Sequence, residues 1–474
     1  MTLRSLLLLA ATAIVAAPVQ AESLADAIAR AYAQNPELAA QRAVVRQADE
    51  AVPQALALGR PTVGARANFD QAGLDGFSDN GRTYTLGGSI TQSLYQGGRV
   101  RNAVSAAEAR ILAARARLRA TENQIVLGVV TAYADVLRFQ KVVELNESQV
   151  KVLQRELQAS SDRFEVGDLT RTDVAQSQAR LAVARSNLVV AGNQLAAARQ
   201  AFTRVVGETP EVLEPLPALP PLPGTEGQAV DIAEANNPAL IAARFDEAAA
   251  RYDVKDIQKR RLPSVTAELR ASFLRFEGGG GGASFVRQGQ FVTQDAIVTG
   301  TIPLYQAGTV GSQTRQAQAR RGQLMETITT VARATQENVV NSFNQLRAAR
   351  AVIEASKVAV EANALAAEGV TQENQVGTRT IIELLNAQQE LLNAQVNLAT
   401  AERDEQVAGF ALLAAAGGAE AVALGAPVQA YDPEANAKRV RHKWSDAGDE
   451  NPDPLPLPDA ARASRSLVIG PQQP

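Results

Sequence analysis

Two closely similar copies of a helix–turn–helix segment lie at matching places in the two halves of this sequence. The first copy, residues 164–181, reads FEVGDLTRTDVAQSQARL, and the second, residues 374–391, reads NQVGTRTIIELLNAQQEL. In each copy a glycine can adopt the positive φ that ends a helix, and a threonine three residues later can cap the next helix. The duplication predicts a fold of two similar units, each with one such turn.

The turn residues match position by position between the two copies. The matched pairs are Val166 and Val376, Gly167 and Gly377, Thr170 and Thr380, and Asp173 and Glu383. The acidic residue stands three places after the threonine, which is the spacing of a capping box at the first turn of a helix. We therefore expect each turn to join two helices tightly.

Apolar residues recur every seven positions on both sides of these turns. Residues 99–206 and 309–416 both show this pattern, and large and small side chains alternate along the apolar seam. A seven-residue repeat is typical of coiled coils. As a single helix, the stretch from Arg99 to Phe164 would be roughly 100 Å long. We predict one long coiled-coil hairpin in each half.

Each half also contains a predicted β-hairpin ahead of its helical hairpin. In these segments, about 62–94 and 264–304, apolar and polar residues alternate, as residues 63–70 illustrate. The strands are long enough to cross an outer membrane, which takes about 9–11 residues. A short helical stretch precedes each β-hairpin and contains an Asn-Pro pair, at Asn35 and Asn237, where we expect a helix to begin.

These patterns divide the chain into five parts. We interpret 1–21 as a cleaved signal peptide, because a positive charge, a short apolar run and a small-residue site follow one another. The first repeat is 22–208, a Pro-rich connector follows at 209–224, and the second repeat is 225–425. The Pro-rich and polar segment 426–474 is predicted to be a flexible tail.

Composition excludes several classes of protein. The chain has no cysteine and a single histidine, so a disulfide framework, a thiolate or histidine metal site and a Ser-His-Asp triad all lack support. The formal net charge of −3 gives no reason to expect nucleic acid as a partner. We expect no metal, no cofactor and no enzymatic activity.

Four strands in each chain cannot close a membrane barrel, because an open sheet edge is not tolerated in lipid. Three chains would give twelve strands around an aqueous interior, whereas two would give eight around a nearly filled one. This geometry indicates a conduit in the outer membrane.

One alternative to the conduit is a periplasmic coiled-coil adaptor or scaffold. A second, less favoured alternative is a secreted hydrolase that uses carboxylates such as Asp173 and Glu383.

The doubled turns, the Asn-Pro starts and the Leu-Tyr-Gln motifs at Leu94 and Leu304 resemble the TolC family of outer-membrane efflux and secretion ducts. The resemblance covers roughly 22–425. It implies an α+β membrane protein that forms a homotrimer, with a shared twelve-stranded barrel and a long periplasmic helical tunnel. It also implies a periplasmic adaptor and an inner-membrane transporter as partners, in efflux or type I secretion. The resemblance does not identify the substrate that is transported.

The resemblance also implies roles for individual residues near the turns. The adaptor-docking tips would be Val166, Gly167, Thr170, Val376, Gly377 and Thr380. A latch that closes the tunnel would join Arg379 to Thr172 and Asp173. Glu383 would form a ring of charge inside the entrance. Asn386 stands where the family has a second acidic ring, so we expect weaker cation selectivity. Asn374 likewise replaces a tyrosine of the latch network.

Overall fold

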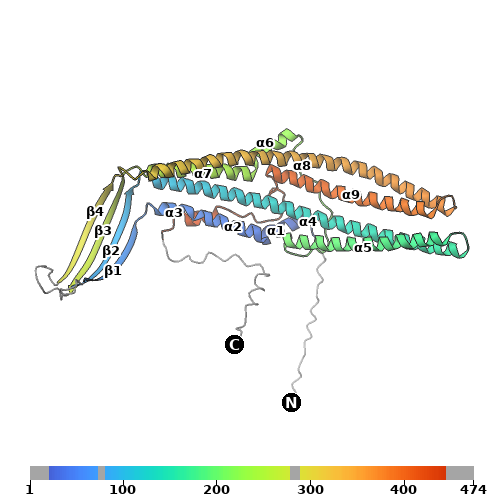
Figure 1. Ribbon diagram of the computed structural model, residues 1–474, viewed down its shortest axis with the longest axis horizontal. Helices are drawn as coiled ribbons and strands as arrows, with labels where there is room; N and C mark the ends of the chain where they lie inside the picture. Colours follow the sequence, from blue (N-terminus) through green and yellow to red (C-terminus); the bar gives the residue numbers. More distant parts are fainter. Residues whose placement is uncertain (1–20, 73–80, 278–288, 445–474) are drawn as a thin grey trace, which may run out of the picture.

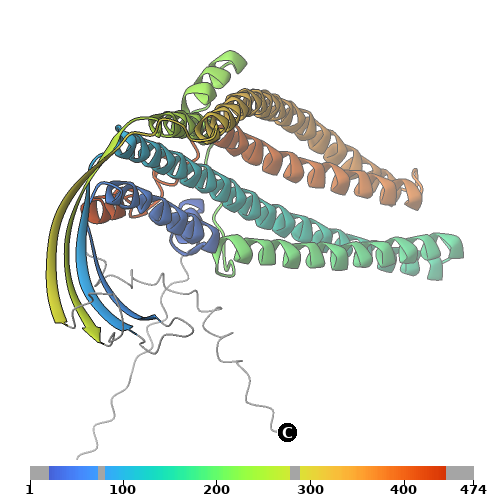
Figure 2. The same ribbon diagram turned by 60° about the vertical axis from the view of Figure 1, so that its left-hand side comes forward.

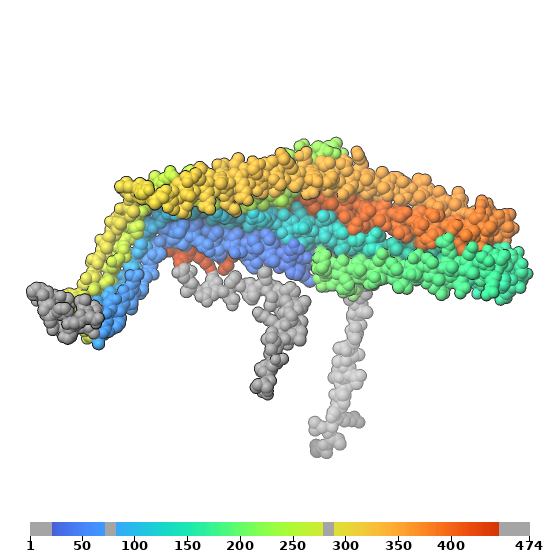
Figure 3. Space-filling model, viewed as in Figure 1, coloured from blue at the N-terminus to red at the C-terminus, as the bar shows by residue number. Residues whose placement is uncertain are grey.

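The computed structural model describes residues 21–72, 81–277 and 289–444. Residues 1–20 of the predicted signal peptide, residues 73–80 and 278–288 within the two predicted β-hairpins, and residues 445–474 of the predicted tail lie outside these ranges. The molecule is elongated, with a β-sheet at one end and two helical hairpins that run to the other (Figure 1). In the space-filling view the two hairpins lie against each other along the tip half of the molecule (Figure 3).

The described elements alternate between helices and pairs of strands. In chain order they are α1 (Leu24–Gln34), α2 (Pro36–Asp49), α3 (Ala51–Ala57), β1 (Thr62–Ala72), β2 (Gly81–Tyr95), α4 (Arg99–Glu165), α5 (Arg171–Val206), α6 (Glu226–Asn236), α7 (Pro238–Lys259), β3 (Ser264–Glu277), β4 (Gly289–Thr301), α8 (Thr309–Gln375), α9 (Ile381–Ala416) and α10 (Ala435–Val440). Within the described ranges, no helix combines the length and the apolarity needed to cross a membrane.

The two halves of the chain have the same architecture. The long helices α4 and α8 are each 67 residues, and their partners α5 and α9 are each 36 residues. Each partner runs back antiparallel along the tip half of its long helix (Figures 1 and 2). Small residues of the seams, such as Ala184 and Ala394, are buried. The predictions of two repeats and of a long helical hairpin in each are confirmed.

The Asn-Pro pairs begin helices and also fasten them. The Asn35 side chain accepts hydrogen bonds from the N–H groups of residues 37 and 38, and its amide donates to the carbonyl of Val205 at 3.0 Å. The second copy does the same, since Asn237 caps α7 and donates to the carbonyl of Ala415 at 2.9 Å. Each asparagine therefore ties the start of its helix to the end of the hairpin in its own half.

The four strands form one antiparallel sheet in the order β1-β2-β3-β4. Residues directly opposite each other point to the same face. One row across the sheet is Val63, Ile90, Leu269 and Ala296, and the next row is Gly64, Ser89, Arg270 and Asp295. The sheet therefore has one predominantly apolar face and one face that carries charged groups, as the alternation predicted.

The main core lies where α4 and α5 meet the short helices of the first half. Tyr133 and Phe202 are fully buried there, with ring centroids 6.3 Å apart. The Tyr133 hydroxyl lies 2.8 Å from the carbonyl oxygens of both Glu22 and Glu214. A separate apolar cluster lies in the tip half of the molecule, where Leu153 and Leu384 pack between the two hairpins. The hairpins are thus joined by apolar contacts.

The prediction of a flexible tail is wrong for residues 426–444. The backbone N–H of Tyr431 donates to the hydroxyl of Tyr32 at 3.0 Å, and Val440 in α10 is buried. The helix α10, drawn red, lies beside α2 near the strand end of the molecule (Figure 2). A polar composition suggested disorder, but partners far away in the sequence hold this segment. Residues 445–474 lie outside the described ranges.

Candidate functional site

The two turns at the hairpin tips have nearly the same geometry. Gly167 and Gly377 have φ of 85° and 79°, as the positive-φ prediction required. A Cβ built on either glycine would meet no atom within 4 Å, and Val166 and Val376 are 81% and 75% exposed. Each tip is therefore a flat, open turn whose backbone another molecule can approach closely.

Both predicted capping boxes are confirmed. The Thr170 hydroxyl accepts from the N–H of Asp173, whose carboxylate accepts from the N–H of Thr170 at 3.0 Å. Thr380 and Glu383 make the same reciprocal pair, with the Thr380 N–H 2.9 Å from the carboxylate. These bonds satisfy N–H groups that the first helical turn leaves unpaired. They fix the direction in which each outgoing helix leaves its turn.

Arg379 forms ion pairs within its own hairpin. Its Nε donates to Glu373 at 2.7 Å and its Nη1 donates to Glu383 at 2.9 Å, so the guanidinium bridges the two sides of the turn. The predicted latch partners Thr172 and Asp173 belong to the other hairpin. One chain does not bring the three latch residues together, and Asp173 is engaged in its own capping box. Any latch must therefore compete with the pairs that Arg379 already makes.

Two arginines that the sequence interpretation missed link the hairpins. Arg163 pairs with Asp168 at 2.8 Å, and its Nη1 lies 3.5 Å from the carbonyl oxygen of Asn374 in the other hairpin. Arg180 donates to the side chain of Asn386 at 2.7 Å. The predicted ring position at Asn386 thus takes part in a contact between hairpins. Such a contact has no periodic signal in sequence.

Glu383 carries the clearest electrostatic signature at the tips. Hydrogen bonds to its carboxylate lower the pKa of Glu383 to about 2. The N–H of Thr380 contributes most, followed by the Thr380 hydroxyl and the guanidinium of Arg379. Hydrogen bonds to the ionised form of a carboxyl favour that form. The residue is therefore a fixed negative charge at any physiological pH.

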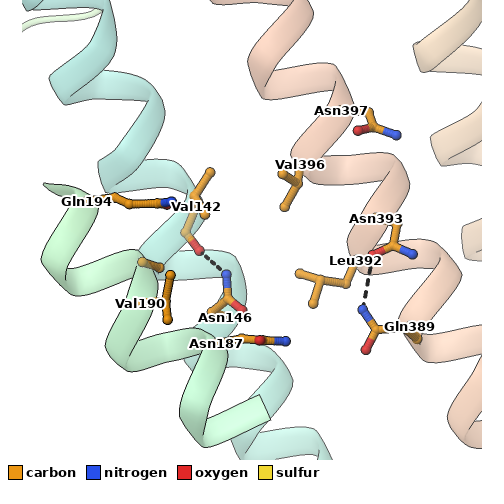
Figure 4. A pocket seen from close by; sticks show the side chains of 11 residues that line it. Val142, Asn146, Asn187, Val190, Gln194, Gln389, Leu392, Asn393, Val396 and Asn397 are labelled. Carbon is orange, nitrogen blue, oxygen red and sulfur yellow. Dashed lines mark hydrogen bonds between the residues drawn. The ribbon is translucent and has the colours of Figure 1, made fainter. Parts of the chain in front are cut away.

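A groove lined by amide and apolar side chains lies between the two hairpins behind the tips (Figure 4). It has a volume of about 460 Å³ and is lined by residues of α4, α5 and α9. Its amide side chains are Asn146, Asn187, Gln194, Gln389, Asn393 and Asn397. On α9 the amides recur every four residues, which puts them on one helical face. That stripe is the signal from which sequence reasoning could have found the groove. The lining is uncharged.

The sequence pattern of one protein family, described as outer membrane efflux protein, matches residues 27–208 and 229–418. The chain belongs to the outer membrane efflux protein family. The two matched ranges correspond to the two repeats of the structure. They include both hairpin tips and all four strands.

Individual efflux proteins are similar along most of the chain. The chain is 34% identical to outer membrane efflux protein BepC of Brucella suis biovar 1 (strain 1330), over 92% of this chain and 94% of that protein. It is 27% identical to outer membrane protein TolC of Escherichia coli (strain K12), over 81% and 79%. The crystal structure of VceC from Vibrio cholerae superposes with a TM-score of 0.71 at 22% identity, over 83% and 96%.

Membership of the family establishes where the protein lies and what kind of protein it is. It is an outer-membrane protein with a large periplasmic portion, and it serves as an exit duct of efflux or type I secretion. The family consists of channel proteins. This outcome confirms the resemblance stated from the sequence and favours the duct over the periplasmic adaptor.

Proposed function

We propose that three copies of the chain form one duct, which receives substrates from an inner-membrane transporter through a periplasmic adaptor and carries out no catalysis. The sheet supports this proposal most directly. All four strands share one largely apolar face, while β1 and β4 are the outer strands of the sheet in one chain. Three sheets joined edge to edge would remove these edges and place the apolar rows against lipid.

The tips are proposed as the docking site for the adaptor. Two exposed turns with matching geometry in each chain give six similar sites in a trimer, which suits a partner ring of six. The open space around Gly167 and Gly377 supports close backbone contact. The amide-lined groove between the hairpins extends this surface, and its uncharged donors and acceptors suit a polar helix of the partner.

The proposed latch joins Arg379 of one hairpin to Thr172 and Asp173 of an adjoining hairpin when three chains close the tunnel. Each exposed ion pair of this kind is weak. A closed state that rests on a few such pairs can therefore be opened by a partner that binds the open state better. The bonds of Arg379 to Glu373 and Glu383 would then be the open-state alternative.

Replacing Arg379 by alanine is expected to raise the mean single-channel conductance severalfold, because the closed state loses its cation in all three chains. Replacing Glu373 by glutamine should have the opposite effect, since it frees Arg379 from a competing partner at 2.7 Å. Recordings in planar lipid bilayers measure both. Lys357→Ala is the control, because it removes another exposed ion pair on α8 away from the turn. Equal conductance in all four proteins would contradict the latch.

The charge of Glu383 is expected to make the pore cation-selective over a wide pH range. With a pKa lowered to about 2, the carboxylate stays ionised as the pH falls from neutral to about 4, where a carboxyl of ordinary pKa is largely protonated. The reversal potential in a salt gradient should therefore indicate the same cation selectivity at neutral pH and at pH about 4. In Glu383→Gln, the reversal potential should indicate lower cation selectivity at both pH values. Strong cation selectivity that survives this substitution would contradict the assignment.

A further inference from the structure

The charged face of the sheet becomes apolar near one end of the strands. Near the middle of the strands, one row across this face consists of Arg66, Gly87, Ser272 and Thr293. The next two rows on this face place three apolar side chains on β3 and β4, which are Leu274, Phe276 and Phe291. These rows lie at the end of the sheet that is farthest from the helices (Figure 1). The polar face is therefore interrupted here by three neighbouring apolar residues.

These three residues, here called the phenylalanine patch, lie together across the two strands. Leu274 is directly opposite Phe291 in the register of β3 and β4. The rings of Phe276 and Phe291 have centroids 6.2 Å apart and are inclined at 64° to each other, which is an edge-to-face arrangement. Phe291 remains 45% exposed. The patch therefore offers an aromatic surface that the described parts of the chain leave open.

The opposite, apolar face of the sheet loses its apolar character at the same level. Its last row that contains aromatic side chains is Phe69, Tyr84, Arg275 and Gln290. Beyond this row, Arg82 lies opposite Glu277. Aromatic residues at the end of an apolar band are typical of the boundary between a membrane and water. The phenylalanine patch lies at this boundary but on the other face, so contact with lipid does not account for it.

A carboxylate without a counter-ion lies on the same face as the patch. Asp70 is in the same row as Phe276 and two strands away, which corresponds to about 10 Å. Among the described residues, Asp70 takes part in no ion pair. Arg66 stands on this face about 13 Å back along the strand, and Arg82 of the next strand points to the opposite face. Aromatic rings beside an uncompensated negative charge favour a ligand that is both apolar and cationic.

We propose that the phenylalanine patch and Asp70 bind cations with an aromatic body at the outer end of the duct. The rings of Phe276 and Phe291 contact the apolar body, and the Asp70 carboxylate attracts the positive charge. In a barrel of three joined sheets, each patch lies between β1 of its own chain and β1 of the next copy, so an Asp70 stands on either side of it. This inference rests on the proposed shared barrel, which turns the charged face toward the interior.

Binding of propidium, a membrane-impermeant cation with an aromatic body, tests this proposal. Fluorescence anisotropy measures the affinity of propidium for the purified oligomer in detergent, and single-channel recording measures how long it blocks the potassium current. Tetramethylammonium, which has a charge but no rings, should compete poorly. The double variant Phe276→Ala, Phe291→Ala should lower the affinity and shorten the block about tenfold, as expected for the loss of two contacts between a cation and a ring. Asp70→Asn should lower the affinity about threefold.

Matched control variants exist on both faces of the sheet. The double variant Phe273→Ala, Val292→Ala removes a facing apolar pair from the opposite face of the same two strands, and the affinity for propidium should not change. Asp295→Asn removes a carboxylate from the same face as the patch but nearer to the helices, and it should also leave the affinity unchanged. The double variant Phe276→Tyr, Phe291→Tyr keeps both rings and should keep the wild-type affinity.

Three outcomes would overturn the binding patch. Equal affinity of the wild-type protein and the phenylalanine-to-alanine double variant for propidium would show that the rings bind nothing. Unchanged affinity in Asp70→Asn would contradict the cationic class of ligand. A higher potassium conductance of the double variant without a change in propidium affinity would make the patch a barrier to ions. A wild-type protein that binds propidium as expected but carries no current would contradict the duct and support the patch, so the two failures are distinguishable.

Discussion

Replacing Gly167 and Gly377 together by leucine is expected to abolish export in cells while leaving the oligomer assembled. Both glycines have positive φ, and no atom lies within 4 Å of a Cβ at either position. A leucine side chain would therefore strain only its own turn, by about 1–2 kcal/mol at each site. It would also stand outward where a partner must approach the backbone. Loss of a central contact of this kind lowers the affinity for the partner by about tenfold or more.

The matched control for the tip variant is Gly98→Leu with Gly308→Leu. These glycines have φ of 80° and 76°, also with no atom within 4 Å, but they lie at the junctions between strands and helices. The two double variants carry similar backbone strain at opposite ends of the molecule. Substrate export in cells that lack the wild-type protein measures function, and gel migration without heating measures assembly. An equal loss of export in both double variants would point to strain and contradict docking at the tips.

Replacing Gly417 by alanine is expected to destabilise the protein more than other glycine replacements at helix ends. Gly417 ends α9 with φ of 84°, and a Cβ there would meet the backbone oxygen of Asn236 at 2.5 Å. Backbone cannot rotate away as a side chain can, so α9 must move relative to the junction of α6 and α7. Strain at positive φ and overpacking together amount to about 2–5 kcal/mol. The melting temperature, followed by circular dichroism in detergent, should fall clearly.

Gly207→Ala is the matched control, because Gly207 ends α5 at the corresponding place in the first half. Its φ is 102°, but the nearest atom to an added Cβ is Oε1 of the Gln34 side chain, at 3.1 Å. That side chain can move, so only the backbone strain of about 1–2 kcal/mol should remain. Melting temperatures that fall equally in the two variants would contradict the close packing of Gly417 on the α6–α7 junction.

Features with a local cause could be predicted from the sequence. The capping boxes at Thr170 and Thr380 follow from a three-residue spacing, and the helix starts at Asn35 and Asn237 follow from one dipeptide. The apolar face of the sheet follows from alternation, because successive side chains of a strand point to opposite faces. The duplication strengthened each of these predictions, since every local signal occurs twice at matching places.

Features that depend on distant partners could not be predicted in this way. Asn436 and Tyr431 are held by Asp49 and Tyr32, nearly four hundred residues earlier, so the composition of the segment suggested disorder. The partners of Arg379 were a different case. Glu383 follows it by four residues, a spacing that favours an ion pair on a helix. The structure contains this pair, and the latch role that the resemblance implies for Arg379 stays a prediction.

The central claim is that three copies share one barrel that continues into a helical tunnel. Single-particle electron microscopy of the protein extracted from isolated outer membranes tests this claim most directly. We expect tubes with threefold averages, a short barrel at one end and tapering hairpin tips at the other. Particles with two chains, or rods from the soluble periplasmic fraction that lack a barrel end, would contradict the shared barrel and the duct built on it.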